Sequence, residues 1–264
     1  MADSKPRSTS KHVDDEGLRA RGIYLLPNLF TSTALFAGFY AIVQAMNSNF
    51  EMSAIAIFIA MVMDGLDGRV ARMTNTQSAF GAEYDSLSDM VSFGVAPALI
   101  MYVWALKPMG KLGWIAAFIY CACAALRLAR FNTKLDDAYQ DKRYFQGLPS
   151  PAAAALIAGF VWVAYEYGIS GREIFFGAIQ MKWMAWGLTV FAAGSMVSDL
   201  KFYSGKDINL KKSVPFVAIL AIVMAFVLVS YSPPEVLFTV VLVYALSGYY
   251  LWVKSQIKKP NKLE

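Results

Sequence analysis

The segment 64–89 contains four aspartates whose spacing divides them into two pairs. Asp64 and Asp67 are three residues apart, and Asp85 and Asp89 are four residues apart. Because residues three or four apart share one face of a helix, the two members of each pair would point in the same direction. Four carboxylates gathered in an apolar setting repel one another and are costly to desolvate, so protons or cations must lie among them.

These carboxylates have the chemistry of a site for hard divalent cations. Oxygen ligands suit Mg²⁺ or Mn²⁺, and two such ions held close together are suited to phosphoryl transfer. We therefore expect two divalent ions among the four aspartates. Arg72 could contact a phosphate, or it could simply anchor its helix at the membrane boundary. Small residues that would leave room for a ligand near the backbone are Gly65, Gly68, Ala71 and Gly81.

Long apolar runs surround this segment and indicate an all-α polytopic integral membrane protein. Hydrophobic residues make up 57% of the chain and charged residues only 16%, against about 25% charged in an average soluble protein. A membrane-spanning helix needs roughly 20 apolar residues. Strands are not expected, because the apolar runs do not alternate with polar residues. The sequence predicts about eight transmembrane helices, over 23–46, 51–72, 81–106, 112–131, 149–167, 181–198, 214–231 and 235–253.

The connection 73–80 decides how the two aspartate pairs meet. It is short, so the helices 51–72 and 81–106 should be antiparallel neighbours. At a rise of about 1.5 Å per residue, the two pairs fall at similar depth below the membrane surface. We therefore expect them to face each other.

The distribution of Lys and Arg indicates the orientation in the membrane. With the N-terminus inside and the eight helices alternating, 20 of the 24 Lys and Arg residues lie on the cytoplasmic side. Such a bias sets the orientation of membrane proteins. We expect a bacterial inner (plasma) membrane protein with the aspartates facing the cytoplasm. The net charge of +5 then reflects topology and contact with anionic lipid, not nucleic-acid binding.

The pattern D-x-x-D-G-x-x-A-R, eight residues, then G-x-x-x-D-x-x-x-D resembles that of the CDP-alcohol phosphatidyltransferase family. It is matched at Asp64, Asp67, Gly68, Ala71, Arg72, Gly81, Asp85 and Asp89. The resemblance implies a helical membrane fold, often a homodimer, with a divalent-metal site open to the cytoplasm. It implies transfer of a phosphatidyl group from a CDP-linked lipid to an alcohol, with release of CMP.

The resemblance also implies a role for each motif residue. The aspartates Asp64, Asp67 and Asp85 would bind the metal ions, while Asp89 could also touch a metal and would act as the general base. Residues that resemble the nucleotide-contacting positions of the family are Gly68, Ala71, Arg72 and Gly81.

Three other stretches resemble the phosphatidylserine synthase branch of this family: LPNLFT at 26–31, RLARFN at 127–132 and GLPSP at 147–151. Asn28 and Thr31 share one helix face and could reach the nucleotide. Arg127 and Arg130 also share a face and would form a pocket for a carboxylate or phosphate, although anchoring of the helix at the cytoplasmic boundary is the alternative.

The resemblance leads us to expect CDP-diacylglycerol and L-serine as substrates. Glycerol 3-phosphate or an inositol phosphate is the alternative acceptor, but a phosphorylated acceptor would require more basic residues near the site. Only Arg127 and Arg130 qualify, apart from Lys142 and Arg143 in a loop. A cation transporter is the alternative of another class. It is disfavoured because the carboxylates cluster at one side and no row of ionisable residues continues outward.

We expect three regions along the chain. Residues 1–15 would form a polar flexible tail, and residues 16–198 the six-helix core of the family. Residues 199–264 would add two transmembrane helices, which carry no motif, and a basic C-terminal tail.

Overall fold

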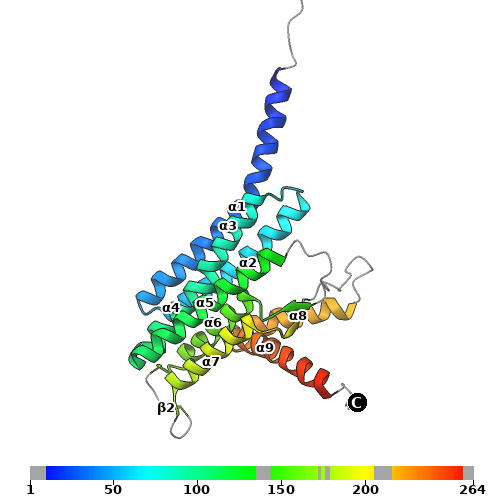
Figure 1. Cartoon of the computed structure of the whole chain (residues 1–264). Coiled ribbons are helices and arrows are strands. Elements are labelled where there is room, and N and C mark those ends of the chain that lie inside the picture. The colour runs from blue at the N-terminus through cyan, green and yellow to red at the C-terminus, as the bar shows by residue number, and fades with distance from the viewer. Residues whose placement is uncertain (1–9, 135–143, 172–173, 176–178, 205–215, 258–264) are drawn as a thin grey trace, which may run out of the picture.

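The computed structural model describes residues 10–134, 144–171, 174–175, 179–204 and 216–257, and helices dominate them (Figure 1). The long apolar runs explain this, since a helix satisfies all its backbone hydrogen bonds internally. In chain order the α-helices are α1 (Ser10–Met46), α2 (Phe50–Met73), α3 (Ala79–Asp89), α4 (Ala96–Met101), α5 (Lys111–Lys134), α6 (Ser150–Glu166), α7 (Met181–Val197), α8 (Phe216–Tyr231) and α9 (Pro233–Ile257).

One continuous helical segment runs from α3 to Met109 and includes changes of helix type. The π-helical turn η1 (Met90–Val95) separates α3 from α4, and a second π-helical turn, η2 (Tyr102–Leu106), follows α4. The short 3-10 turn η3 (Lys107–Met109) ends the segment. Together these elements form the helix predicted over 81–106.

The mostly helical prediction is confirmed, and each predicted helix has a counterpart that ends within a few residues of the expected position. The largest difference is at α1, which begins at Ser10 and projects beyond the bundle (Figure 1). Residues 10–15 of the predicted polar tail are therefore helical. Four helical segments of the described residues are long and apolar enough to cross a membrane, namely Leu26–Met46, Ala79–Met109, Lys111–Thr133 and Pro233–Ile257.

The expectation that strands are absent is wrong for the connections between helices. β1 (Tyr144–Gln146) pairs antiparallel with β4 (Lys201–Tyr203), and β2 (Ile174–Phe175) pairs antiparallel with β3 (Ile179–Gln180). These strands are two or three residues long, so they are too short to produce an alternating pattern in the sequence.

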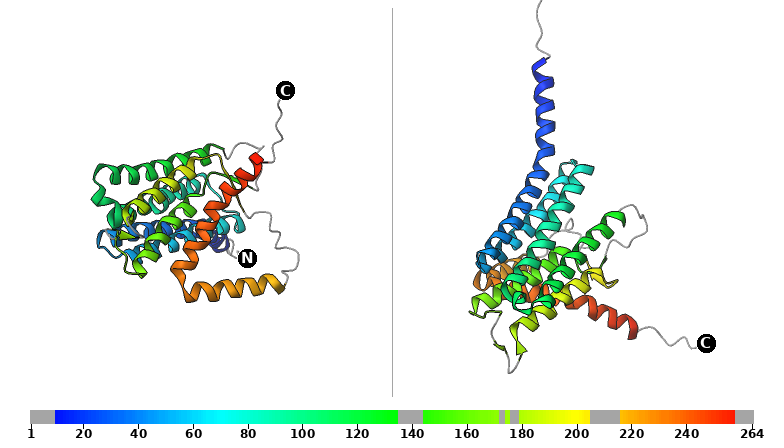
Figure 2. Two further views of the ribbon diagram at one scale, coloured as in Figure 1. Left: turned by 90° about the horizontal axis from the view of Figure 1, so that it is seen from below. Right: turned by 60° about the vertical axis from the view of Figure 1, so that its left-hand side comes forward.

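Close helix packing builds the core. α1 packs on α2 and α3, α2 on α6, α6 on α9, and α5 on α7. Many fully buried core residues are alanines, such as Ala41, Ala54 and Ala154, and small residues let helix backbones approach closely in membranes. α8 contacts α9 and stands apart from the rest of the bundle (Figure 2).

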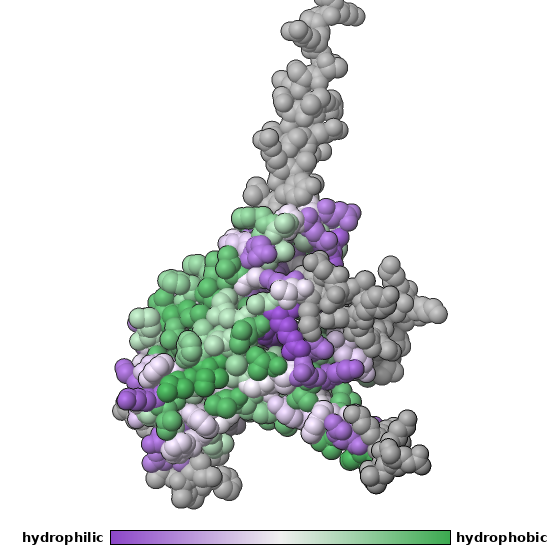
Figure 3. Space-filling model, viewed as in Figure 1, coloured by the Kyte–Doolittle hydropathy of each residue, from purple (hydrophilic) through white to green (hydrophobic). Residues whose placement is uncertain are grey.

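The outer surface fits a position within lipid. Hydrophobic residues cover the middle of the face shown in Figure 3, while hydrophilic residues gather towards the top right, the right side and the lower left. Large apolar side chains such as Phe36, Phe118 and Phe226 are exposed. Lipid would cover them, because water does not reach the hydrocarbon core of a bilayer.

We expect Gly38 to be essential for the contact between α1 and η1. A Cβ atom at this position would lie 2.7 Å from the Ser92 Cα, so the helices would have to separate. Gly38→Ala should lower the free energy of unfolding by about 1–3 kcal/mol, as overpacking does. Thermal unfolding in detergent measures the change.

The matched control is Gly187→Ala in α7, where a Cβ atom would meet no other atom within 4 Å. In a helix interior, alanine is about 1 kcal/mol more favourable than glycine. This variant should therefore be at least as stable as the parent. Equal stability of the two variants would contradict the close-contact explanation.

Candidate active site

Three of the four motif aspartates meet between α2 and α3. Carboxylate oxygens of Asp64, Asp67 and Asp85 all lie within 4.8 Å of one another. Asp67 is only 5% exposed, and the other two are half-buried. The antiparallel arrangement predicted from the short connection 73–80 therefore brings the two pairs together. Oxygen ligands at this separation fit a hard divalent cation, whose charge would offset their mutual repulsion.

The Asp67 carboxylate is oriented by hydrogen bonds from two directions. Thr31 on α1, itself 3% exposed, donates its hydroxyl to Asp67 Oδ2 at 2.6 Å. The backbone N–H of Gly68 donates to Oδ1. Residues that hold a ligand carboxylate in this way orient it and tune the affinity for the metal. Thr31, predicted to reach the nucleotide, therefore also supports the acidic cluster.

Asp89 lies next to this cluster and forms its edge. The Asp64 carboxylate interacts electrostatically with the carboxylates of Asp85 and Asp89. Like charges this close are favourable only with a proton or a cation among them. On its other side Asp89 interacts electrostatically with Arg127 on α5. Asp89 thus sits between the acidic cluster and the half-buried Arg127.

A π-helical turn begins directly after Asp89 and is stabilised from α5. Tyr120, which is fully buried, donates its hydroxyl to the Phe93 carbonyl oxygen in η1 at 3.2 Å. Ser92 in the same turn donates to the Ala34 carbonyl oxygen on α1 at 3.1 Å. Such turns are frequent at functional sites, because they change the direction of neighbouring side chains. Here the turn sets the orientation of Asp89 relative to the helix that follows.

A cavity of about 160 Å³ opens beside the acidic cluster. Gly81 helps to keep it open, since a Cβ atom there would lie 3.1 Å from Ser78 Oγ and 3.5 Å from Asn28 Oδ1, both on lining residues. Its lining includes all six residues predicted to contact the nucleotide and two of the aspartates, namely Asn28, Thr31, Gly68, Ala71, Arg72, Gly81, Asp67 and Asp85.

Arg127 is half-buried and only partly hydrogen-bonded. Its Nη1 donates to Ser150 Oγ at 2.7 Å, at the start of α6. Its Nε is buried and has no hydrogen-bond partner among the described residues. A buried donor without a partner is costly, so a ligand that accepts from it would bind favourably. Tyr244 of α9 also lies within electrostatic range of this guanidinium.

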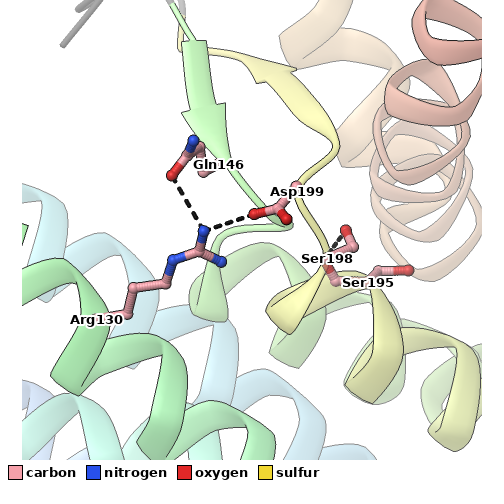
Figure 4. Close-up of polar contacts among 5 residues, drawn as sticks. All are labelled: Arg130, Gln146, Ser195, Ser198 and Asp199. Atoms are coloured by element: carbon pink, nitrogen blue, oxygen red, sulfur yellow. Dashed lines mark hydrogen bonds and ion pairs between the residues drawn. The ribbon is translucent and has the colours of Figure 1, made fainter.

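Arg130 has a different environment from Arg127, although the two are three residues apart. It forms an ion pair with Asp199 and donates from the same Nη2 to Gln146 Oε1 at 3.3 Å (Figure 4). Gln146 belongs to β1, and Asp199 lies between α7 and β4. Arg130 therefore connects the end of α5 to the two-stranded sheet, and the prediction that it binds the acceptor stays a prediction.

Several residues of the site carried no signal in the sequence. Ser78, which caps α3 and accepts from the Gly81 N–H at 3.0 Å, lies in a connection that the sequence marked only as short. Asp199 and Tyr244 come from segments without a motif. Lys142 and Arg143, considered as further basic residues, lie outside the described residues. Other residues that line the cavity but were not predicted are Pro27, Thr76, Gln77 and Ala82.

An acidic cluster that could hold a metal ion lies beside a cavity within a bundle of apolar helices, and these features define a helical membrane protein. The chain belongs to the CDP-alcohol phosphatidyltransferase family, whose model matches residues 24–194. This range includes every residue of the motif.

Similar proteins extend the likeness over most of the chain. A protein of Helicobacter pylori (strain J99) is 34% identical over 241 residues, which cover 89% of this chain and 94% of that protein. One of Mycobacterium leprae is 32% identical over 250 residues (91% and 76%). One of Methanocaldococcus jannaschii is 34% identical over 200 residues (75% and 83%). Each of the three is named CDP-diacylglycerol–serine O-phosphatidyltransferase.

We expect divalent-cation binding to depend on Asp64 and, less strongly, on Thr31. Loss of a residue that only orients a ligand typically weakens metal binding by roughly 10–100-fold. Thr31→Val should fall in that range, and Asp64→Asn should exceed it because a ligand oxygen is lost. Calorimetric titration of the purified protein with Mn²⁺ measures both.

Glu83→Gln provides the control, because Glu83 is an exposed carboxylate on α3 outside the motif. This variant should bind Mn²⁺ as the parent does. Asp64→Asn should remain folded, since removing one of several like charges relieves repulsion. Unchanged Mn²⁺ binding in Asp64→Asn would contradict the metal site.

Proposed function

We propose that this protein transfers the phosphatidyl group of CDP-diacylglycerol to the hydroxyl of L-serine, giving phosphatidylserine and CMP. The observation that carries the proposal is the convergence of the motif aspartates beside a cavity lined by all the predicted nucleotide-contacting residues. The names of the three similar proteins, which match over most of the chain, support serine as the acceptor. They give no support to the alternative acceptors or to a cation transporter.

The cavity is suited to the cytidine diphosphate part of the donor. Gly68, Ala71 and Gly81 leave the backbone accessible, and Arg72 at the end of α2 offers a guanidinium to a phosphate. Asn28 offers an amide to the nucleotide. The diacylglycerol chains would extend into lipid, because the helical segments Leu26–Met46 and Ala79–Met109, which carry several of these residues, are long and apolar enough to cross a membrane.

Asp64, Asp67 and Asp85 would hold divalent cations, and Asp89 would complete the set. When bound, a cation of this type neutralises the diphosphate and the charge that develops on departing CMP. We propose that the site holds two divalent ions, either Mg²⁺ or Mn²⁺. The support for them is the number of carboxylates and the oxygen-only ligand set.

Asp89 is the proposed general base. The serine hydroxyl oxygen forms a bond to the lipid-linked phosphorus as the bond from that phosphorus to the CMP oxygen breaks. The hydroxyl proton passes to the Asp89 carboxylate. The position of Asp89, between the acidic cluster and Arg127, supports this role, because a general base must lie within hydrogen-bond reach of the proton that it takes.

Arg127 is the proposed ligand of the serine carboxylate. Its unpartnered Nε would donate to one carboxylate oxygen, while its bond to Ser150 holds the guanidinium in place. A planar guanidinium can bind both oxygens of a carboxylate at once. Charge attraction between Arg127 and the nearby aspartates keeps the cation close to the reacting atoms.

We further propose eight transmembrane helices, with the site facing the cytoplasm of a bacterial inner membrane. The supports are the bias of Lys and Arg to one side and the counterparts of all eight predicted helices. The family match over 24–194 supports a core at 16–198 and an addition at 199–264. A homodimer is proposed on the family resemblance alone.

The function is tested with purified protein, CDP-diacylglycerol, Mg²⁺ or Mn²⁺, and separate acceptors. CMP should be released with L-serine and not with glycerol 3-phosphate or an inositol phosphate, and phosphatidylserine should form in equal amount. Arg127→Lys should raise the serine KM roughly tenfold or more, because a charge-assisted hydrogen bond contributes about 1.5–3 kcal/mol. The KM for CDP-diacylglycerol should change much less.

The same kinetic measurements would also reveal results that contradict the proposal. CMP release that is fastest with another acceptor would refute serine as the substrate. A rise in the donor KM with an unchanged serine KM in Arg127→Lys would instead assign this arginine to the donor phosphates. Asp89→Asn should still bind CDP-diacylglycerol, because Asp64, Asp67 and Asp85 remain as metal ligands. It should lose most turnover, because the proposed base is removed.

The orientation is tested with single cysteines on the two sides of the bundle. Gln77, exposed in the connection between α2 and α3, should be cytoplasmic, while Lys107, exposed at the other end of the α3 segment, should face outward. A membrane-impermeant thiol reagent added to intact cells should label Lys107→Cys and not Gln77→Cys. The reverse pattern would invert the topology and the proposed side of the site.

A further inference from the structure

The two-stranded sheet of β1 and β4 adjoins both arginines. β1 leads directly into the turn before Ser150, which binds Arg127, while its Gln146 binds Arg130. We propose that Arg130 and Asp199 form a clamp that holds β1 against β4, and thereby positions Ser150 and Arg127 for the acceptor. The proposal rests on the proposed function. It makes Arg130 a positioning residue, not a ligand of serine.

The turn between β1 and α6 transmits the position of the sheet to Ser150. The Gly147 N–H donates to the Leu200 carbonyl oxygen at 2.9 Å, and the Leu148 N–H donates to the Ser195 carbonyl oxygen at 2.8 Å. Gly147 has a φ of 75°, and a Cβ atom there would lie 2.2 Å from the Met196 carbonyl oxygen. The turn is therefore bound to the end of α7 and leaves no room for a side chain at position 147, and Ser150 follows three residues later.

The last helix supports β4 from the other side. Phe202 of β4 is fully buried against Gly248 of α9, where a Cβ atom would lie 2.4 Å from the Phe202 ring. The Tyr244 hydroxyl on α9 donates to the Tyr203 carbonyl oxygen at 3.2 Å. α9 therefore holds β4, while the turn and the ion pair at Asp199 both act at the end of the sheet where Gln146 pairs with Lys201.

Because the Arg130–Asp199 ion pair is exposed, we expect its loss to have only a modest effect on the serine KM. The Asp199 side chain is 79% exposed and that of Arg130 is 37% exposed. Loss of an exposed ion pair changes an equilibrium by roughly two- to fivefold, whereas loss of a direct charged ligand changes it by roughly tenfold or more. The size of the change in the serine KM therefore separates a clamp from a ligand.

The experiment uses the full chain with two measurements. Arg130→Ala should raise the serine KM roughly two- to fivefold, leave the CDP-diacylglycerol KM unchanged, and speed hydrogen–deuterium exchange in the peptide 144–150. The charge-reversed variants Arg130→Asp and Asp199→Arg should show the same changes singly. The double variant should restore both measurements towards the parent, because the pair is re-formed with opposite signs. Lys201→Ala, which removes an exposed cation from β4, is the control and should change neither.

Three results would overturn the clamp. One is unchanged hydrogen–deuterium exchange at 144–150 in Arg130→Ala, and another is a double variant as impaired as the single ones. The third is a serine KM raised tenfold or more that the double variant does not restore. Faster exchange that the double variant reverses, with a constant serine KM, would remove the link to Arg127. A parent protein without serine-dependent CMP release would refute the proposed function instead, and the exchange measurements would still decide whether the ion pair holds the sheet.

Discussion

Repulsion among the clustered carboxylates is the constraint on which the rest of the site depends. Oxygens of Asp64, Asp67 and Asp85 lie within 4.8 Å of one another in a bundle of apolar helices. Such an arrangement is unfavourable without a proton or a counter-charge, so the packing that brings the carboxylates together would favour a bound cation. Two features of the fold keep the carboxylates together. α1 packs closely on α2 and α3, and the Thr31 hydroxyl donates a hydrogen bond to Asp67.

The two arginines of α5 illustrate how environment separates residues of the same type and spacing. Arg127 interacts electrostatically with Asp64 and Asp89, donates to Ser150 and has a buried donor with no hydrogen-bond partner in the described part of the chain. Arg130, one turn further along, is more exposed and has its charge matched by Asp199. A cation whose charge is already paired has less to offer an anionic ligand, whereas one with an unpaired buried donor gains by binding. The difference in partners therefore suggests a difference in role.

The C-terminal part of the chain takes part in the site although it carries no motif. α9 packs on α6, supports β4 through Phe202 and Tyr244, and brings Tyr244 within electrostatic range of Arg127. α8 makes fewer contacts and connects α9 to the rest. The family match ends at residue 194, so the sheet strand β4 and its supporting helix lie outside the matched range. The proposed acceptor side of the site thus combines matched and unmatched segments.

The amino-acid sequence by itself determined the helices, the acidic motif and the facing of the two aspartate pairs. These follow from local rules: apolar runs long enough for a helix, spacings of three and four residues, and a connection too short for any arrangement but an antiparallel one. Only the tertiary structure decided the hydrogen bond from Thr31 to Asp67, the partners of Arg127 and Arg130, and the pairing of β1 with β4. These contacts join residues far apart in the chain, and no periodicity encodes them, because they depend on how the helices pack in three dimensions.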